Sequence, residues 1–241
     1  MKPTTSKSDD EDGKGVDYNQ EYYIMAYEEQ NKIRKFLREI IYKQEWKLIK
    51  SKSDYLLDVG CGTGDLLRFS NTKKSLGVDI SKFAIESLKR IDKYGVVADI
   101  KYLPFKQNTV GYVMYNDVIE HLEITERDRS LKEVYNILSG GGRIIIRTTN
   151  LELMLKKYED EPEFVDTGDP THKYFYSRGN LENILRDNGY RAVVSSSDFL
   201  LATLFFIPSF MICDSILKVL SKILSPVKNS YGCILIIGEK Q

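Results

Sequence analysis

A short apolar run that passes directly into three closely spaced glycines constrains the fold of this 241-residue chain more than any other feature. The segment, residues 55–67, reads YLLDVGCGTGDLL. Its first residues have no helical period, as expected of an inner strand of a parallel sheet. Gly60, Gly62 and Gly64 then let the backbone turn sharply and approach a ligand, and we expect a helix to begin after them. The segment therefore predicts the strand, turn and helix that start an α/β fold.

The spacing of the glycines indicates which ligand the turn accepts. A dinucleotide-binding turn has a third glycine at the sixth position of G-x-G-x-x-G, where a pyrophosphate rests on the helix N-terminus. That position is Asp65 here, and Asp58 adds a carboxylate at the end of the strand. Two carboxylates disfavour a pyrophosphate. The turn is thus more suited to a ligand that carries a cation, and an NAD-dependent oxidoreductase is disfavoured.

The pattern of Asp58, Gly60, Gly62 and Gly64 resembles motif I of the class I S-adenosylmethionine-dependent methyltransferases. This cofactor carries a sulfonium and an ammonium but no phosphate, in agreement with the charges of the turn. The resemblance covers about residues 55–190 and is nearest to the type 11, ubiquinone-biosynthesis-like subgroup. It implies S-adenosylmethionine as cofactor, S-adenosylhomocysteine as product, and a Rossmann-like fold with a mostly parallel seven-stranded sheet and helices on both faces.

Two further predicted strands end in acidic residues. Residues 76–80, LGVDI, place Asp79 about 20 residues beyond the glycines, the distance at which a carboxylate meets ribose hydroxyls in doubly wound folds. Residues 96–100, VVADI, end at Asp99 and Ile100. The resemblance implies that Asp99 accepts from the exocyclic amine of the adenine and that Ile100 lies beside the ring.

A fourth strand, residues 110–115, runs into NDVIEHL, residues 116–122. This segment resembles the family motif that lies beside the methionine end of the cofactor and the methyl acceptor. The predicted cofactor-binding residues are therefore Asp58, Gly60, Cys61, Gly62, Gly64, Asp79, Ile80, Asp99, Ile100, Asn116 and Asp117.

The rest of the chain continues the alternation of helices and strands. Turn residues and β-branched runs predict helices over residues 126–138 and 180–188 and strands over residues 143–149, 190–197 and 231–237.

The chain has only two histidines, and both are candidates for the methyl-acceptor side. His172 lies in PTHKYFYSR, which resembles the family segment that closes one side of the acceptor pocket. A neutral imidazole can take the proton of a hydroxyl acceptor, so His172 is the first candidate for a base and His121 the second. The alternative for both residues is that they only pack or form hydrogen bonds. With two histidines and three widely spaced cysteines we expect no metal site, and the cysteines favour a reducing compartment.

Residues 1–16 are rich in charged residues, serine and glycine and lack the apolar core of a signal peptide, so we expect a disordered tail before a single domain over residues 17–241. Residues 17–52 should form helices that cap the cofactor pocket. Their tyrosines could stack on the cofactor or form a structural cluster. Residues 32–52 carry eight basic residues on an amphipathic helix, which indicates a solvated outer face or, alternatively, an RNA-binding face.

An apolar insert over residues 199–228 departs from a minimal methyltransferase. Its most apolar part, residues 199–213, is interrupted by Pro208 and is too short for a membrane-spanning helix, which needs about 20 apolar residues. An amphipathic helix follows. The insert could lie in a membrane interface, cover a lipid-like acceptor or form a protein or dimer contact.

The formal net charge is zero, which argues against a broad electrostatic attraction to DNA or RNA. We therefore expect O-methylation of a small or lipid-like acceptor by a cytoplasmic enzyme, with peripheral membrane contact as an option. The alternatives are a tRNA or protein methyltransferase that uses the basic helix, and a non-catalytic module that binds S-adenosylmethionine.

Overall fold

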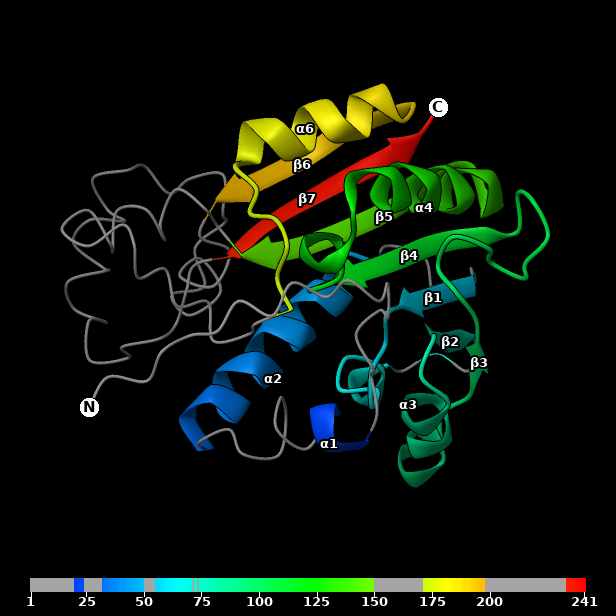
Figure 1. The fold of residues 1–241 in the computed structure, drawn as a ribbon, viewed down its shortest axis with the longest axis vertical. Helices are drawn as coiled ribbons and strands as arrows, with labels where there is room; N and C mark the ends of the chain where they lie inside the picture. Colours follow the sequence, from blue (N-terminus) through cyan, green and yellow to red (C-terminus); the bar gives the residue numbers. More distant parts are fainter. Residues whose placement is uncertain are drawn as a thin grey trace, which may run out of the picture.

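The computed structural model describes residues 20–23, 32–49, 55–70, 72, 74–149, 171–197 and 233–241. Two helices, α1 (Gln20–Tyr23) and α2 (Lys32–Lys47), precede a seven-stranded sheet (Figure 1). The strands are β1 (Tyr55–Val59), β2 (Ser75–Asp79), β3 (Gly95–Val97), β4 (Val110–Asn116), β5 (Leu138–Thr149), β6 (Tyr190–Ser197) and β7 (Cys233–Lys240). The other α-helices in the described part of the chain are α3 (Lys82–Ser87), α4 (Ile124–Ile137) and α6 (Arg178–Asp187).

The strand order is β3-β2-β1-β4-β5-β7-β6, and β7 runs antiparallel to both of its neighbours. The pairs β1–β2, β2–β3, β1–β4 and β4–β5 are parallel. The predicted Rossmann-like, mostly parallel seven-stranded sheet is therefore confirmed. The chain builds β1 to β3 toward one edge and then returns to place β4 on the other side of β1.

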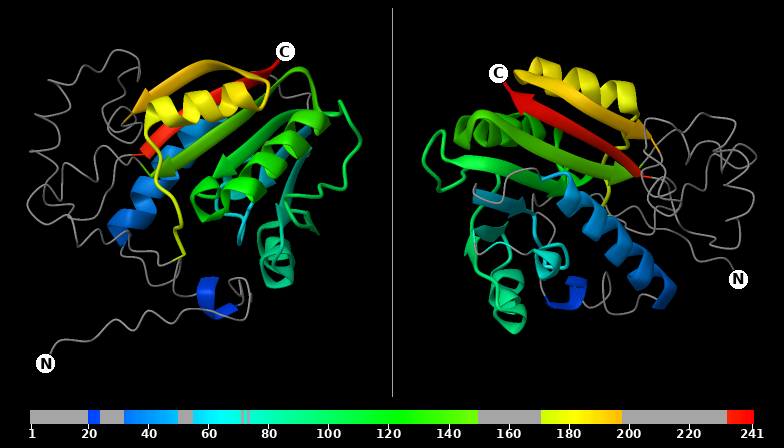
Figure 2. Two further views of the ribbon diagram at one scale, coloured as in Figure 1. Left: turned by 45° about the horizontal axis from the view of Figure 1, so that its top comes forward. Right: turned by 180° about the vertical axis from the view of Figure 1, so that it is seen from behind.

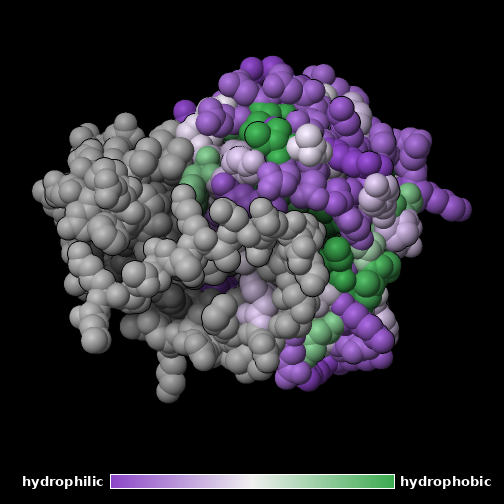
Figure 3. Space-filling model, in the orientation of Figure 1, coloured by the Kyte–Doolittle hydropathy of each residue, from purple (hydrophilic) through white to green (hydrophobic). Residues whose placement is uncertain are grey.

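Alternate residues of the central strands pack on opposite faces of the sheet, which explains why these strands read as unbroken apolar runs. Val113, Tyr115 and Ile144 join the core beneath α4 and α6. Met114 and Ile145 join a second core with Ile41 and Tyr42 of α2. Figure 2 shows α2 on the side of the sheet opposite α4 and α6. Figure 3 shows mainly hydrophilic residues on the outer surface at the top of the view, where α6 lies.

Among the described residues, one predicted element is wrong: the helix expected after the glycine turn. A 3-10 helix, η2 (Leu67–Phe69), stands there instead. The connection between Gly64 and β2 is short, and the Ser70 hydroxyl donates to the Thr72 carbonyl and accepts from the Thr72 N–H. Such local side-chain bonds offer the backbone a turn in place of a helix.

Several predictions fall on residues that the structure does not describe. They are the tail over residues 1–16, the whole apolar insert over residues 199–228, and Tyr18, Tyr27 and Cys213. Among the described helices, none is long and apolar enough to cross a membrane.

Candidate functional site

The reversal of strand order between β1 and β4 positions the candidate site. In open α/β sheets a ligand binds beyond the carboxyl ends of the strands at such a switch point. The predicted cofactor-binding residues follow β1, β2, β3 and β4, and the parallel register brings these strand ends to one edge of the sheet.

The glycine turn needs its glycines for both conformation and space. Gly60, Gly62 and Gly64 have φ values of +74°, +50° and +86°, in the region that side chains rarely adopt. A Cβ on Gly60 would lie 2.4 Å from Cγ2 of Val118. The close approach places the turn after β1 directly against the segment after β4. The Cys61 side chain is buried in the core beside α2, so this residue lines the turn through its backbone.

Asp79, at the end of β2, organises the turn. Its Oδ2 accepts from the Gly62 N–H at 2.9 Å, and its Oδ1 accepts from the Ser81 N–H at 2.9 Å. The Tyr23 hydroxyl of α1 donates to Oδ1 at 3.3 Å, and the Tyr23 ring stacks on Phe83. A carboxylate has about four acceptor sites, and the Ile80 N–H also acts on this one, so a ligand hydroxyl would share an oxygen with these donors. The next residue, Ile80, is 57% exposed and offers an apolar surface beside that carboxylate.

The carboxyl groups of Glu45 and Asp79 lie near that of Asp58 at the end of β1. Asp58 is 3% exposed, and burial together with the nearby charges of Glu45 and Asp79 raises its pKa to about 8. Burial also raises the pKa of Asp79 above its usual range. A cation bound here would lower both pKa values by favouring the charged carboxylates.

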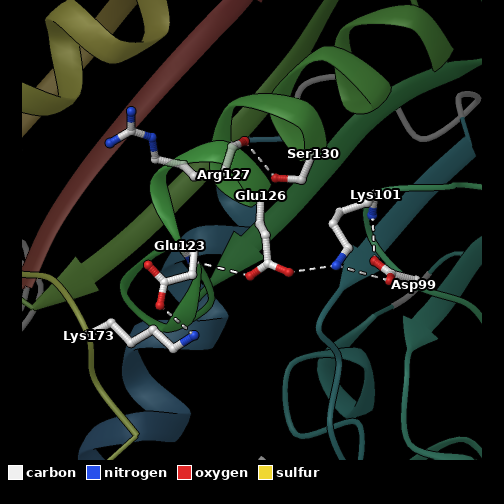
Figure 4. Close-up of polar contacts among 7 residues, drawn as sticks. All are labelled: Asp99, Lys101, Glu123, Glu126, Arg127, Ser130 and Lys173. Carbon is white, nitrogen blue, oxygen red and sulfur yellow. Dashed lines mark hydrogen bonds and ion pairs between the residues drawn. The ribbon is translucent and has the colours of Figure 1, made fainter. Parts of the chain in front are cut away.

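Asp99 follows β3, three strands away from β4 in the sheet, but polar contacts link it to the segment after β4 (Figure 4). Its Oδ1 accepts from the Lys101 N–H at 2.9 Å, and the Lys101 ammonium lies 3.4 Å from Oδ2. The same ammonium donates to Glu126 at 2.6 Å, and Glu126 in turn accepts from the backbone N–H of Glu123. Lys101 therefore fixes the orientation of Asp99, while Ile100 is half-buried against the core beneath α4.

Asn116 and Asp117, after β4, are held by two residues that the sequence did not predict for the site. The Glu45 carboxylate of α2 accepts from the Asn116 amide at 2.7 Å and lies 2.8 Å from Nε of Arg147. Arg147 of β5 donates through Nη2 to Asp117 at 2.9 Å. Asp117 has a φ of +52°, which Asp tolerates better than most residues.

Both of these missed residues are buried, and each carries a sequence signal. Glu45 is 0% exposed and Arg147 is 6% exposed. Glu45 follows Ile41 by one helical turn on the buried face of α2, and Arg147 interrupts the apolar run of β5. Burial raises the pKa of Glu45 to about 7, while the guanidinium of Arg147 opposes that rise.

The two histidines lie together after β4, although they are far apart in the sequence. Their ring centroids are 4.7 Å apart at an interplanar angle of 67°. His121 ends the 3-10 helix η4 (Ile119–His121), and its Nδ1 lies 2.8 Å from the Thr171 hydroxyl. Beside them Glu120 is 1% exposed, and burial and the charge of Asp117 raise its pKa to about 8. The sequence did not predict a role for Glu120.

The residues around the glycine turn fit S-adenosylmethionine. The turn is packed so closely that a Cβ on Gly60 would clash with Val118. The carboxyl groups of Asp58 and Asp79 suit a sulfonium and an ammonium. A dinucleotide fits less well, because only a three-residue 3-10 helix follows the turn and no α-helix directs its N-terminus at a pyrophosphate.

Comparison with known proteins supports the same reading. Residues 57–146 match the model of the methyltransferase domain family of type 11. An uncharacterized protein of Methanocaldococcus jannaschii is 29% identical over 84% of this chain and 87% of its own length. Probable tRNA methyltransferase 9B of Mus musculus is 28% identical over 45% of this chain, and the match spans 24% of the mouse protein.

Solved structures share the fold. A methyltransferase of Thermotoga maritima that depends on S-adenosylmethionine has a TM-score of 0.61 at 18% identity, over 91% of this chain and 99% of its own. Another, from Archaeoglobus fulgidus, has a TM-score of 0.58 at 22% identity, over 84% and 94%. Identities this low show a common fold and give no information about the substrate.

Proposed function

The chain belongs to the class I S-adenosylmethionine-dependent methyltransferases, and from this premise we propose that it methylates an oxygen of a small or lipid-like acceptor. The observation that carries the proposal is the position of the two histidines. Val118 packs on Gly60 of the cofactor turn, and His121 donates its backbone N–H to the Val118 carbonyl at 3.1 Å. The imidazoles thus lie one short turn away from the cofactor site.

The bound cofactor supplies a methyl group on a sulfonium, which transfers by in-line displacement. The residues of this chain bind and orient the two reactants. Asp79 would accept from ribose hydroxyls, Asp99 from the adenine amine, and the backbone of the glycine turn would line the methionine portion together with Asn116 and Asp117. These last two side chains are already oriented by Glu45 and Arg147.

An oxygen acceptor gains from removal of its proton, whereas a neutral amine gains less. His172 is the proposed base and His121 the second candidate. His121 is oriented by Thr171, and His172 lies against it and against Phe175. The lipid-like character of the acceptor is supported by the apolar sequence of residues 199–224, which would line or cover the acceptor.

The experiment is transfer from methyl-labelled S-adenosylmethionine into an extract of the source cells, followed by counting label in lipid, polar-metabolite, RNA and protein fractions. The Asp79→Ala variant is the blank. We expect label in the lipid or polar-metabolite fraction from the unaltered protein alone. Label in RNA would instead favour a tRNA substrate, and cofactor binding without any label would favour a non-catalytic binding module.

A further inference from the structure

The chain's only two histidines meet at one buried carboxyl group. Potential ligand atoms of Glu120, His121 and His172 all lie within 4.8 Å of one another. We propose that these three side chains bind one divalent first-row transition-metal ion, with Zn²⁺ as the reference ion. The proposal departs from the sequence-based expectation of no metal site, which rested on the number of histidines and could not foresee their convergence.

Backbone contacts hold the three residues together independently of any ion. The N–H groups of Lys173 and Tyr174 donate to the Glu120 carbonyl at 2.8 and 3.1 Å. The Tyr176 hydroxyl donates to the Ile119 carbonyl at 3.3 Å. The segment that carries His172 is therefore tied to η4, which carries the other two residues. A site assembled in this way loses little conformational entropy when it binds an ion.

The orientation of His121 suits a ligand. Its Nδ1 lies 2.8 Å from the Thr171 hydroxyl and 3.2 Å from the Thr171 carbonyl. Metal-binding histidines commonly donate one ring N–H to such an oxygen, which fixes the ring and leaves the other nitrogen for the ion. Nε2 of His121 is then the ligand atom.

Glu120 supplies a second, independent observation. Its side chain is 1% exposed, and among the described residues only the Thr148 hydroxyl and a backbone N–H act on its carboxyl group, neither in full hydrogen-bonding geometry. A buried carboxylate is costly unless a cation or hydrogen-bond donors compensate it. The guanidinium of Arg147 is already engaged by Glu45 and Asp117. A metal ion between Glu120 and the imidazoles would provide the missing positive charge.

The ligand set selects the class of ion. Two imidazole nitrogens and one carboxylate oxygen suit Zn²⁺ and its first-row neighbours, whereas Mg²⁺ and Ca²⁺ prefer oxygen ligands. Three protein ligands leave coordination positions open. If the proposed function is correct, an acceptor oxygen at an open position would lose its proton more readily, so that the ion would perform the task assigned above to His172.

The test uses the full chain, with any histidine tag removed and after treatment with a chelator. Zn²⁺ is titrated by calorimetry and Co²⁺ by visible absorption. We expect one equivalent of each ion to bind at micromolar concentration or tighter. Glu120→Gln and His172→Asn should each weaken Zn²⁺ binding by at least about tenfold. Glu123→Gln is the matched control, since this exposed carboxyl is paired with Lys173, and its affinity should equal that of the unaltered protein.

A second measurement needs no variant. Because the chain has two histidines, its imidazole NMR spectrum contains two sets of signals, and both should shift on addition of one equivalent of Zn²⁺. Unshifted signals, a shift of only one set, or equal losses in Glu123→Gln and Glu120→Gln would overturn the proposal. None of these readouts depends on methyl transfer, so failure here leaves the proposed function intact.

Discussion

At the scale of single residues, Asp79 joins three parts of the site through one carboxylate, since it accepts from the glycine turn, from the segment after β2 and from α1. In Asp79→Asn the charge is lost, and the amide NH₂ must face either the Gly62 N–H or the Ser81 N–H, both of which are donors. We expect the affinity for S-adenosylhomocysteine, measured by calorimetry, to fall by about 1.5–3 kcal/mol, the usual value of a charge-assisted hydrogen bond.

Asp65→Asn provides the control from the same turn. The Asp65 carboxylate lies 3.4 Å from Nη1 of Arg38 and 3.8 Å from Nη2 of Arg68, so it is directed at α2 and the surface. Its replacement should leave cofactor affinity within about twofold, because a partly exposed ion pair contributes at most about 1 kcal/mol to stability and none to the ligand. Equal weakening in the two variants would remove Asp79 from the ribose site.

Asp58 should make stability depend on pH. The pKa of an aspartate in the unfolded chain is about 3.9, whereas the pKa of Asp58 in the folded protein is about 8. The folded state therefore holds an extra proton between these two pH values. Stability from this group is complete below pH 4, falls by roughly 1.4 kcal/mol per pH unit, and is lost above pH 8. Asp58→Asn cannot titrate. Its free energy of unfolding relative to the unaltered protein should therefore rise from pH 5 to pH 8 in denaturant titrations, and a constant difference would contradict the shifted pKa.

At the scale of elements, the strands were predictable because each is an apolar run that ends at a turn, and parallel strands buried on both faces leave that signature in the sequence. The absence of an α-helix after the glycine turn was not predictable, because it depends on the local turn that the Ser70 hydroxyl forms with the backbone of Thr72. Glu45 lies among the basic residues of the predicted helix over residues 32–52, where nothing marks it as part of the site. Its partner Arg147 stands on β5, and a pairing between distant elements leaves no periodic signal in either one.

The same pair predicts how α2 is attached to the sheet. Glu45→Gln leaves the buried guanidinium of Arg147 with Asp117 as its remaining charged partner. We expect unfolding at pH 8 to become easier by roughly 2–4 kcal/mol, as when one partner of a buried ion pair is removed. At pH 5 the loss should be larger, because the folded pKa of Glu45 is about 7: the unaltered protein loses stability from this group as the pH rises toward 7, whereas the glutamine cannot titrate.

Glu39→Gln tests whether that loss comes from burial. Glu39 belongs to the same helix, but its ion pair with Lys43, at 3.7 Å, is exposed. This variant should change the free energy of unfolding by less than about 0.5 kcal/mol at either pH. A similar loss in both variants would mean that the helix responds to its net charge and not to the contact with Arg147.

At the scale of the whole molecule, the site draws on β1, β2, β4 and α1, whereas β6 and α6 lie at the far edge of the sheet. Ligand binding at 100 times the dissociation constant should raise global stability by about 2.7 kcal/mol, which slows every amide that exchanges through global unfolding. The amides of Gly62 and Ser81 differ, because they bond to Asp79 in turns that open locally. Hydrogen exchange with S-adenosylhomocysteine should therefore slow at these two amides beyond the global effect, while locally exchanging amides at the ends of α6 stay unchanged. Protection that is uniform over both edges of the sheet would mean that the ligand does not bind at the ends of β1 and β2.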